Sequence, residues 1–239
     1  MVATQNGRRG VIMTYLELCK RLWQECGDTG SGKPATTIGQ TGEMKRICTW
    51  VNQAWVEIQE YRQDWEWLRK NVSFATVAAQ NSYSPTTDIL LTDFASWRTD
   101  GFRIYQTAGG VGNQILLQQY DYTSFRDYYL LGARQITQGR PIAISVAPNK
   151  DLFLGLVPDQ SYTVTGEYFS VPTNLTLDAD TPVMPTRFHM AIVYKAMMMY
   201  AAFESAPEVM ASASSQYSAM INQLESDQTP PILNAPALI

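Results

Sequence analysis

The spacing of apolar residues changes at Asn71, and this change constrains the fold more than any other feature of the sequence. Before it, apolar residues recur every three or four positions, the period of an amphipathic helix. After it, Val72, Phe74, Thr76 and Ala78 alternate with smaller or polar residues, as in a strand. The long helical stretch predicts a helix of about six or seven turns, capped by Thr41. Its stripe is Met44, Ile47, Cys48, Val51, Ala54, Trp55, Ile58, Tyr61, Trp65 and Leu68.

Three further helices are predicted outside the β region. Thr14 and Glu17 form a capping-box pattern before a short helix. Residues 188–203 are apolar on nearly every side, which predicts a helix buried all round. Ser205 and Glu208, with Pro207 between them, predict the start of a last helix. Its expected stripe is Val209, Ala213, Tyr217, Met220, Ile221 and Leu224.

The middle of the chain is expected to be an antiparallel β region with one inserted helix. Strands are predicted at 102–106, 114–119, 142–146, 152–156 and 162–168, with turns at 109–112 and 148–151. Asp121 should cap the inserted helix, whose predicted inner face is Phe125, Tyr128 and Tyr129. Prolines at 172, 182 and 185 indicate an irregular exit from the sheet.

These elements predict an α+β fold class. Residues 13–70 and 186–227 are expected to form an antiparallel helical bundle. Residues 71–185 are the inserted β region, with a short helix near 122–131. Residues 1–12 are expected to be a flexible leader, and residues 228–239 an extended C-terminal arm.

Composition points to a chain that buries surface against partners. Only 17% of the 239 residues are charged and 45% are hydrophobic, so much of the surface should be neutral or apolar. The net charge of −4, without a cluster of Lys and Arg, argues against nucleic-acid binding. A mildly acidic surface would instead suit a channel that repels DNA phosphates. No apolar stretch is long enough to span a membrane, and we expect a soluble protein.

Residue types that could carry chemistry occur in unfavourable contexts. Residues 27–34 resemble a phosphate-binding loop, but Pro34 replaces the required Ser or Thr and the loop follows a helix. Cys19, Cys26 and Cys48 are expected to be small buried hydrophobes, without a disulfide or zinc site. His189 is the only histidine and is expected to be structural. We therefore expect no cofactor, no metal and no catalytic residue.

Two other functions stay open at this point. Aspartates could supply a small carboxylate-dependent hydrolase, although scattered turn aspartates are expected between strands. They are Asp88, Asp93, Asp100, Asp178 and Asp180. A carbohydrate-binding tail or fibre module could use aromatic residues, although core packing explains most of them better. They are Trp50, Trp55, Tyr61, Trp65 and Trp67.

The C-terminal arm is rich in proline and in apolar residues. Three prolines exclude a helix, whereas disordered tails are usually polar and charged. Its defining residues are Pro230, Pro231, Ile232, Leu233, Pro236, Leu238 and Ile239. Two interpretations remain: the arm docks on a partner, or it folds back on its own domain.

Four segments carry a resemblance to a known family. They are MTYLELCKRLWQECG (13–27), IGQTGE (38–43), WVNQAWVEIQ (50–59) and DWEWL (64–68). Together they resemble the head-to-tail adaptor proteins of tailed bacteriophages, also called head-completion or connector proteins and similar to the tail-tubular proteins of short-tailed phages. The resemblance is strongest over residues 13–83.

The resemblance implies a structural subunit of the virion neck, assembled in the host cytoplasm, and not an enzyme. Such subunits form a ring, typically dodecameric, that joins the portal to tail or nozzle proteins and extends the DNA channel without binding DNA specifically. It implies that the arm residues named above dock on the portal. It also implies that the helix at 188–203 packs against a neighbouring subunit, through Met197, Met198, Tyr200 and Phe203.

Overall fold

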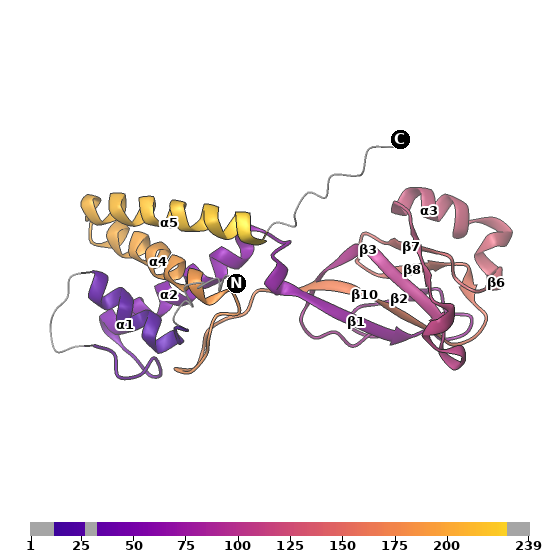
Figure 1. Cartoon of the computed structure of the whole chain (residues 1–239), viewed down its shortest axis with the longest axis horizontal. Helices are drawn as coiled ribbons and strands as arrows, with labels where there is room; N and C mark the ends of the chain where they lie inside the picture. Colours follow the sequence, from indigo (N-terminus) through magenta and orange to yellow (C-terminus); the bar gives the residue numbers. More distant parts are fainter. Residues whose placement is uncertain (1–11, 27–32, 229–239) are drawn as a thin grey trace, which may run out of the picture. The chain divides into compact units, whose positions relative to one another are not determined.

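The computed structural model describes residues 12–26 and 33–228 and divides the chain into two compact units (Figure 1). The helical unit comprises residues 1–67 and 172–239, and the sheet unit comprises residues 68–171. Over the described residues the fold is mixed α+β, with five α-helices and mainly antiparallel sheets. The predicted α+β class is therefore confirmed. Within that part of the chain, no helix is both long and apolar enough to cross a membrane.

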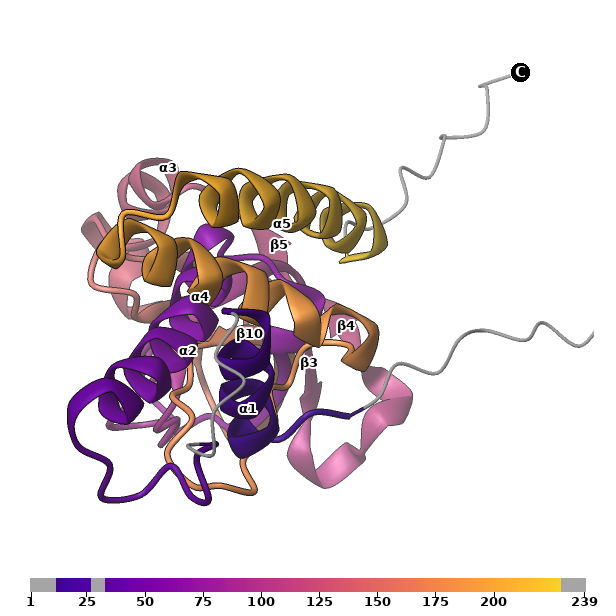
Figure 2. The ribbon, with the colours of Figure 1, turned by 90° about the vertical axis from the view of Figure 1, so that its left-hand side faces the viewer.

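The helical unit contains α1 (Tyr15–Glu25), α2 (Gly42–Tyr61), α4 (His189–Phe203) and α5 (Pro207–Gln228). Helix α4 contacts each of the other three, and Figure 2 shows it between α1 and α5. The capping box of α1 is confirmed. Thr14 Oγ1 accepts a hydrogen bond from the Glu17 N–H at 3.3 Å, and the Glu17 carboxylate accepts one from the Thr14 N–H at 2.7 Å.

Helix α2 is shorter than its apolar rhythm predicts, because the chain turns away at Arg62. Arg62 adopts an extended conformation, and its guanidinium pairs with Asp64. The Trp65 indole N–H then donates to the carbonyl of Ile58 at 2.9 Å, which satisfies one of the last carbonyls of the helix. A short 3₁₀ helix, η1 (Glu66–Leu68), follows. Thr41 occupies the N-cap position as predicted, but its side chain makes no cap hydrogen bond.

Helix α4 is largely but not completely buried, which corrects the prediction that it is buried all round. Ile192, Val193 and Ala196 are fully buried, whereas Met198 and Tyr200 are half-buried and Phe203 is exposed. The cysteine prediction also needs a correction. Cys19 and Cys48 are buried and free, but Cys26 is half-buried at the C-cap of α1.

The segment from 171 to 185 has no regular structure, as its prolines predict, and α1 and α2 hold it in place. Gln59, which is 1% exposed, binds both backbone groups of Thr173: Nε2 donates to the carbonyl and Oε1 accepts from the N–H, each at 2.9 Å. Asn52 accepts from the Leu175 N–H at 2.8 Å. The backbone N–H of Tyr15 donates to the carbonyl of Asp180 at 2.7 Å. These bonds fix the second half of the helical unit onto the first.

The sheet unit contains two four-stranded sheets and one two-stranded sheet. The first has the order β1 (Arg69–Ala75), β10 (Tyr162–Ser170), β3 (Phe94–Gln106) and β4 (Ile115–Leu116). The second has the order β2 (Ser82–Tyr83), β8 (Leu152–Gly155), β7 (Ala143–Val146) and β5 (Gln118–Gln119). The third pairs β6 (Gln138–Gly139) with β9 (Val157–Pro158).

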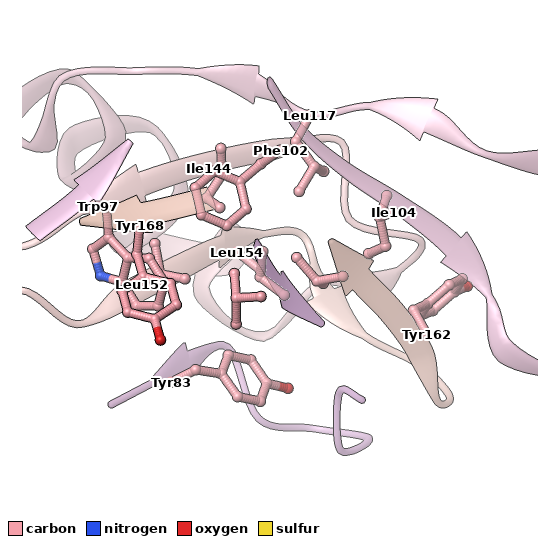
Figure 3. Close-up of a cluster of buried hydrophobic side chains, with 12 residues drawn as sticks. Tyr83, Trp97, Phe102, Ile104, Leu117, Ile144, Leu152, Leu154, Tyr162 and Tyr168 are labelled. Atoms are coloured by element: carbon pink, nitrogen blue, oxygen red, sulfur yellow. The ribbon is translucent and has the colours of Figure 1, made fainter. Parts of the chain in front are cut away.

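The core of the sheet unit consists of side chains from both four-stranded sheets (Figure 3). From the first sheet come Trp97, Phe102 and Ile104 of β3, with Val164 and Tyr168 of β10. From the second come Tyr83, Ile144, Leu152 and Leu154. These alternating inward side chains are the reason for the two-residue period in the sequence.

Several details of the sheet unit bear on the predictions. Both predicted turns are confirmed, since β3 pairs with β4 and β7 with β8, each antiparallel. The inserted helix is α3 (Tyr122–Tyr129), and Asp121 caps it by accepting from the Ser124 N–H at 3.0 Å. Most strand pairs are antiparallel as predicted, but two short pairs, β5 with β7 and β6 with β9, are parallel. Short 3₁₀ helices are η2 (Thr107–Gly109), η3 (Val111–Asn113), η4 (Gly132–Ile136) and, in the helical unit, η5 (Thr186–Phe188).

Candidate assembly surfaces

His189 is a structural residue at the start of α4. Its Nδ1 accepts a hydrogen bond from the Met13 N–H at 3.2 Å, so Nε2 carries the proton and faces the Met184 carbonyl at 3.2 Å. The side chain is 1% exposed, and this burial lowers its pKa. Both ring nitrogens of the neutral imidazole are thus engaged in joining Met13 and Met184 to α4.

The five aspartates considered for a hydrolase site are separated into two sets. Asp88, Asp93 and Asp100 lie in the sheet unit, and Asp178 and Asp180 in the helical unit. Each binds groups close to it in the fold, as expected of turn and ion-pair residues. The partners are the Ser84 N–H for Asp88, Lys70 and Tyr168 for Asp93, Arg98 for Asp100, Thr37 for Asp178, and Thr176 and Leu177 for Asp180.

Their electrostatics also differ from those of a general acid, which needs a raised pKa. The hydrogen bond from Lys70 lowers the pKa of Asp93, and the one from Arg98 lowers the pKa of Asp100. The Thr37 hydroxyl and N–H lower the pKa of Asp178, and backbone N–H groups lower that of Asp180. These four carboxylates are held in their charged form as acceptors.

The aromatic residues of α2 and η1 serve two purposes. Trp55 and Trp65 are buried in the helical core, as predicted, and Trp65 stacks on Trp67 with ring centroids 4.4 Å apart. Tyr61, predicted on the buried stripe, is 58% exposed at the last residue of α2. Trp50 lies off the stripe and is half-buried at the surface.

Trp50 belongs to a surface cluster that we call the aromatic patch, formed by Arg46, Trp50, Tyr200 and Phe203. The Trp50 ring contacts the rings of Tyr200 and Phe203, with centroids 6.1 Å and 5.7 Å away. The Arg46 guanidinium lies over the Phe203 ring, 4.3 Å from its centroid. Two helices distant in sequence, α2 and α4, thus present a continuous surface of aromatic and guanidinium groups.

The aromatic patch contains two of the four residues predicted to pack between subunits. Tyr200 is half-buried and Phe203 is 55% exposed. Met198 is also half-buried, whereas Met197 lies in the protomer core. Sequence reasoning missed Arg46 and Trp50. Arg46 and Trp50 are four residues apart in the sequence, so both lie on the polar face of α2. An aromatic residue on a polar helix face was the sequence signal that could have identified them.

The sheet unit has an exposed surface of its own, which we call the α3–η4 surface, formed by Tyr128, Leu131, Arg134 and Ile136. All residues from 131 to 138 are exposed. The Arg134 guanidinium lies 3.8 Å from the centroid of the Tyr128 ring. Tyr128 is half exposed, so its predicted place on the inner face of α3 is wrong, whereas Phe125 and Tyr129 are buried as expected.

The arm residues Pro230, Pro231, Ile232, Leu233, Pro236, Leu238 and Ile239 lie outside the described residues, as do residues 1–11 of the leader and 27–32 of the glycine-rich loop. Gln228, expected to begin the arm, is the last residue of α5. In the described part of the chain, no three His, Cys, Asp or Glu residues gather as metal ligands would.

Comparison with known proteins gives one clear match. A family model described as SU10 adaptor protein matches residues 13–236, a range that extends through both units. No curated protein matches the chain.

Proposed function

The chain belongs to the SU10 adaptor protein family, a family of phage structural adaptors, and we propose that it forms a ring joining the portal to the tail in the virion neck. The family match is the observation that carries this proposal, because it extends over the helical and the sheet unit together. In the proposal the ring is dodecameric, extends the DNA channel, and assembles in the host cytoplasm before joining the virion.

The family is a structural one and not an enzyme family. The arrangement of the side chains supports the same conclusion. The histidine and the five aspartates considered above bind neighbouring groups of their own units. Trp55 and Trp65 are covered by the helical core and unavailable for stacking on a sugar. Protein–protein association therefore explains the exposed residues better than hydrolysis or carbohydrate binding does.

The proposal assigns the aromatic patch, with Met198, to contacts between neighbouring subunits. Trp, Tyr and Arg are the residue types that dominate interface energetics, and one of each is gathered with Phe203 on α2 and α4. Met197 is already covered within its own protomer, so its contribution is to hold α4 in place.

The proposal assigns the arm to the portal. Residues 229–239 carry no charged side chain and contain Ile232, Leu233, Leu238 and Ile239, which can bury apolar area on a partner. Binding must exceed the cost of ordering the arm. A ring of subunits engaging one portal ring gains affinity through the high effective concentration of each further arm.

The tail or nozzle proteins are the other proposed partners of the ring. The α3–η4 surface supports such a contact, since Tyr128 and Arg134 stack beside exposed Leu131 and Ile136. DNA passes through the ring without specific binding in this proposal, which agrees with the net charge of −4.

Deleting residues 229–239 tests the arm assignment. We expect a folded chain that no longer co-sediments with purified portal or attaches to DNA-filled heads. The matched control keeps the arm but replaces Asn234 by serine, and should bind as the unaltered chain does. Normal attachment of the truncated chain would show that the arm is not the portal-binding element.

A further inference from the structure

A surface groove of about 580 Å³ lies in the helical unit between α1 and the start of α4. Apolar surface dominates its wall, with Met13 and Met190 among the lining residues. Exposed or half-buried residues of one face of α1 form the other side, including Lys20, Arg21 and Gln24. Methionine side chains adapt to irregular apolar partners, so the groove suits aliphatic side chains.

A second hollow, of about 410 Å³, connects this groove to the end of α5. Gln223, Ser226 and Asp227 of α5 line it together with Arg187 and Phe188, and its wall is mainly polar. Arg187 lines both hollows. The Arg187 guanidinium pairs with Asp227 and lies over the Phe188 ring, 4.8 Å from its centroid. The junction of the two hollows is therefore neutral in charge.

The arm begins at the edge of this second hollow, because Asp227 and Gln228 are the last residues of α5. An extended chain covers about 3.3 Å per residue, so Ile232 can lie about 13 Å from Gln228. The order of residues in the arm matches the order of the two hollows. Thr229, Pro230 and Pro231 would pass the polar hollow, and Ile232 and Leu233 would reach the apolar groove beside α1.

From this arrangement we propose that residues 229–239 occupy the groove between α1 and α4 of their own chain before assembly. The tether favours the same chain over a second copy, since a short linker gives a local concentration in the millimolar range. The arm has no charged side chain, so entering the groove leaves the Arg187–Asp227 pair intact. The helical unit thus stores the apolar arm away from solvent.

The regulatory consequence rests on the proposed function. An arm held in its own groove must leave it to bind the portal, so the groove and the portal compete for Ile232 and Leu233. Storage would keep free subunits from associating through their arms. The portal-binding test above and the test below are independent, because the latter uses the isolated chain without portal.

Disulfide trapping in the full chain tests the proposal. In a Cys26→Ser background, one variant carries Gln24→Cys and Ala235→Cys, and its matched control carries Glu25→Cys and Ala235→Cys. Gln24 lines the groove, whereas Glu25 lies about 100° further around α1 and does not. Each rate of disulfide formation is divided by the rate at which the same helix thiol reacts with a small disulfide reagent, which corrects for exposure.

We expect the Gln24 variant to form its intrachain disulfide at least about tenfold faster than the Glu25 variant. Adding Ile232→Asn and Leu233→Asn should bring the two rates together, because these residues anchor the arm. Equal rates in the first pair would overturn the proposal. A disulfide mainly between two chains, seen as a doubled mass, would also overturn it by placing the arm on a second copy.

Discussion

Replacing Phe203 by serine should weaken association between subunits while leaving the chain folded. Phe203 ends α4 in the aromatic patch, where its ring is 55% exposed, contacts Trp50 and lies beneath Arg46. In the proposed ring, a neighbouring subunit covers the exposed part of this ring. The substitution removes that contact while leaving the buried face of α4 unchanged.

The exposed area sets the expected magnitude. A phenylalanine offers about 200 Å², so a 55% exposed ring leaves about 110 Å² available for an interface. At about 25 cal/mol per Å², covering all of it would contribute about 3 kcal/mol to association. Incomplete covering reduces this to about 2 kcal/mol, or roughly a 30-fold weaker dissociation constant for each contact.

The cost to folding should be smaller than the total stability of the protein. The part of the ring already covered and its stacking with Arg46 together contribute about 3 kcal/mol. A stability of about 5–15 kcal/mol is usual for a domain, so the variant should stay folded. A matched control is Ile221→Val, which alters a buried residue of α5, costs about 1 kcal/mol, and leaves the surface unchanged.

Sedimentation velocity over a range of protein concentrations, with purified portal present, measures association, and thermal unfolding of the same samples measures stability. We expect Phe203→Ser to move assembly to roughly 30-fold higher concentration, and Ile221→Val to lower the melting temperature without affecting assembly. If Phe203→Ser assembled at the same concentration as the unaltered chain, the assignment of the aromatic patch to the subunit interface would be wrong.

Three further predictions concern the stability of the fold. His189 is the only histidine, and burial lowers its pKa, so the folded chain binds fewer protons than the unfolded chain near the usual histidine pKa. The free energy of unfolding should therefore be highest above about pH 6.5 and fall as the pH decreases below this value. Chemical denaturation at a series of pH values should show this fall, and His189→Asn should abolish it. Gly166→Ala should lower the free energy of unfolding by about 1–3 kcal/mol, because a Cβ there would lie 2.3 Å from the buried Phe102 ring. The control Gly112→Ala, at a position with open space around it, should leave the melting temperature nearly unchanged. Gln59→Leu should cost about 1 kcal/mol in denaturant unfolding, because two hydrogen bonds that hold the exit segment are lost.

Local signals in the sequence predicted the elements whose causes are local. The capping box at Thr14 and the cap at Asp121 each depend on residues three apart, and both are confirmed. The turn at 148–151 follows from proline and asparagine, and it joins antiparallel strands as expected. Periodicity also identified most of the buried stripe of α2, since one side of this helix packs on the core.

The elements that sequence reasoning missed depend on distant partners. The end of α2 is set by the Trp65 indole binding the carbonyl of Ile58, which an apolar rhythm cannot reveal. The first half of β3, with Arg98, Asp100 and Gly101, precedes the strand predicted at 102–106. It nevertheless pairs with β10, and Arg98 forms an ion pair with Glu167 across the two strands. The aromatic patch joins residues of α2 and α4 that only the folded helices bring together.

The central claim, that this chain is an assembly subunit of the phage neck, is tested most directly by the mass of the purified protein, alone and mixed with the portal of the same phage. Native mass spectrometry or light scattering gives this mass. We expect a closed ring, formed by the protein alone or in complex with the portal, whose mass is a whole multiple of 26.8 kDa beyond that of the portal. A protein that stays monomeric in both samples and does not bind the portal would contradict the proposed function.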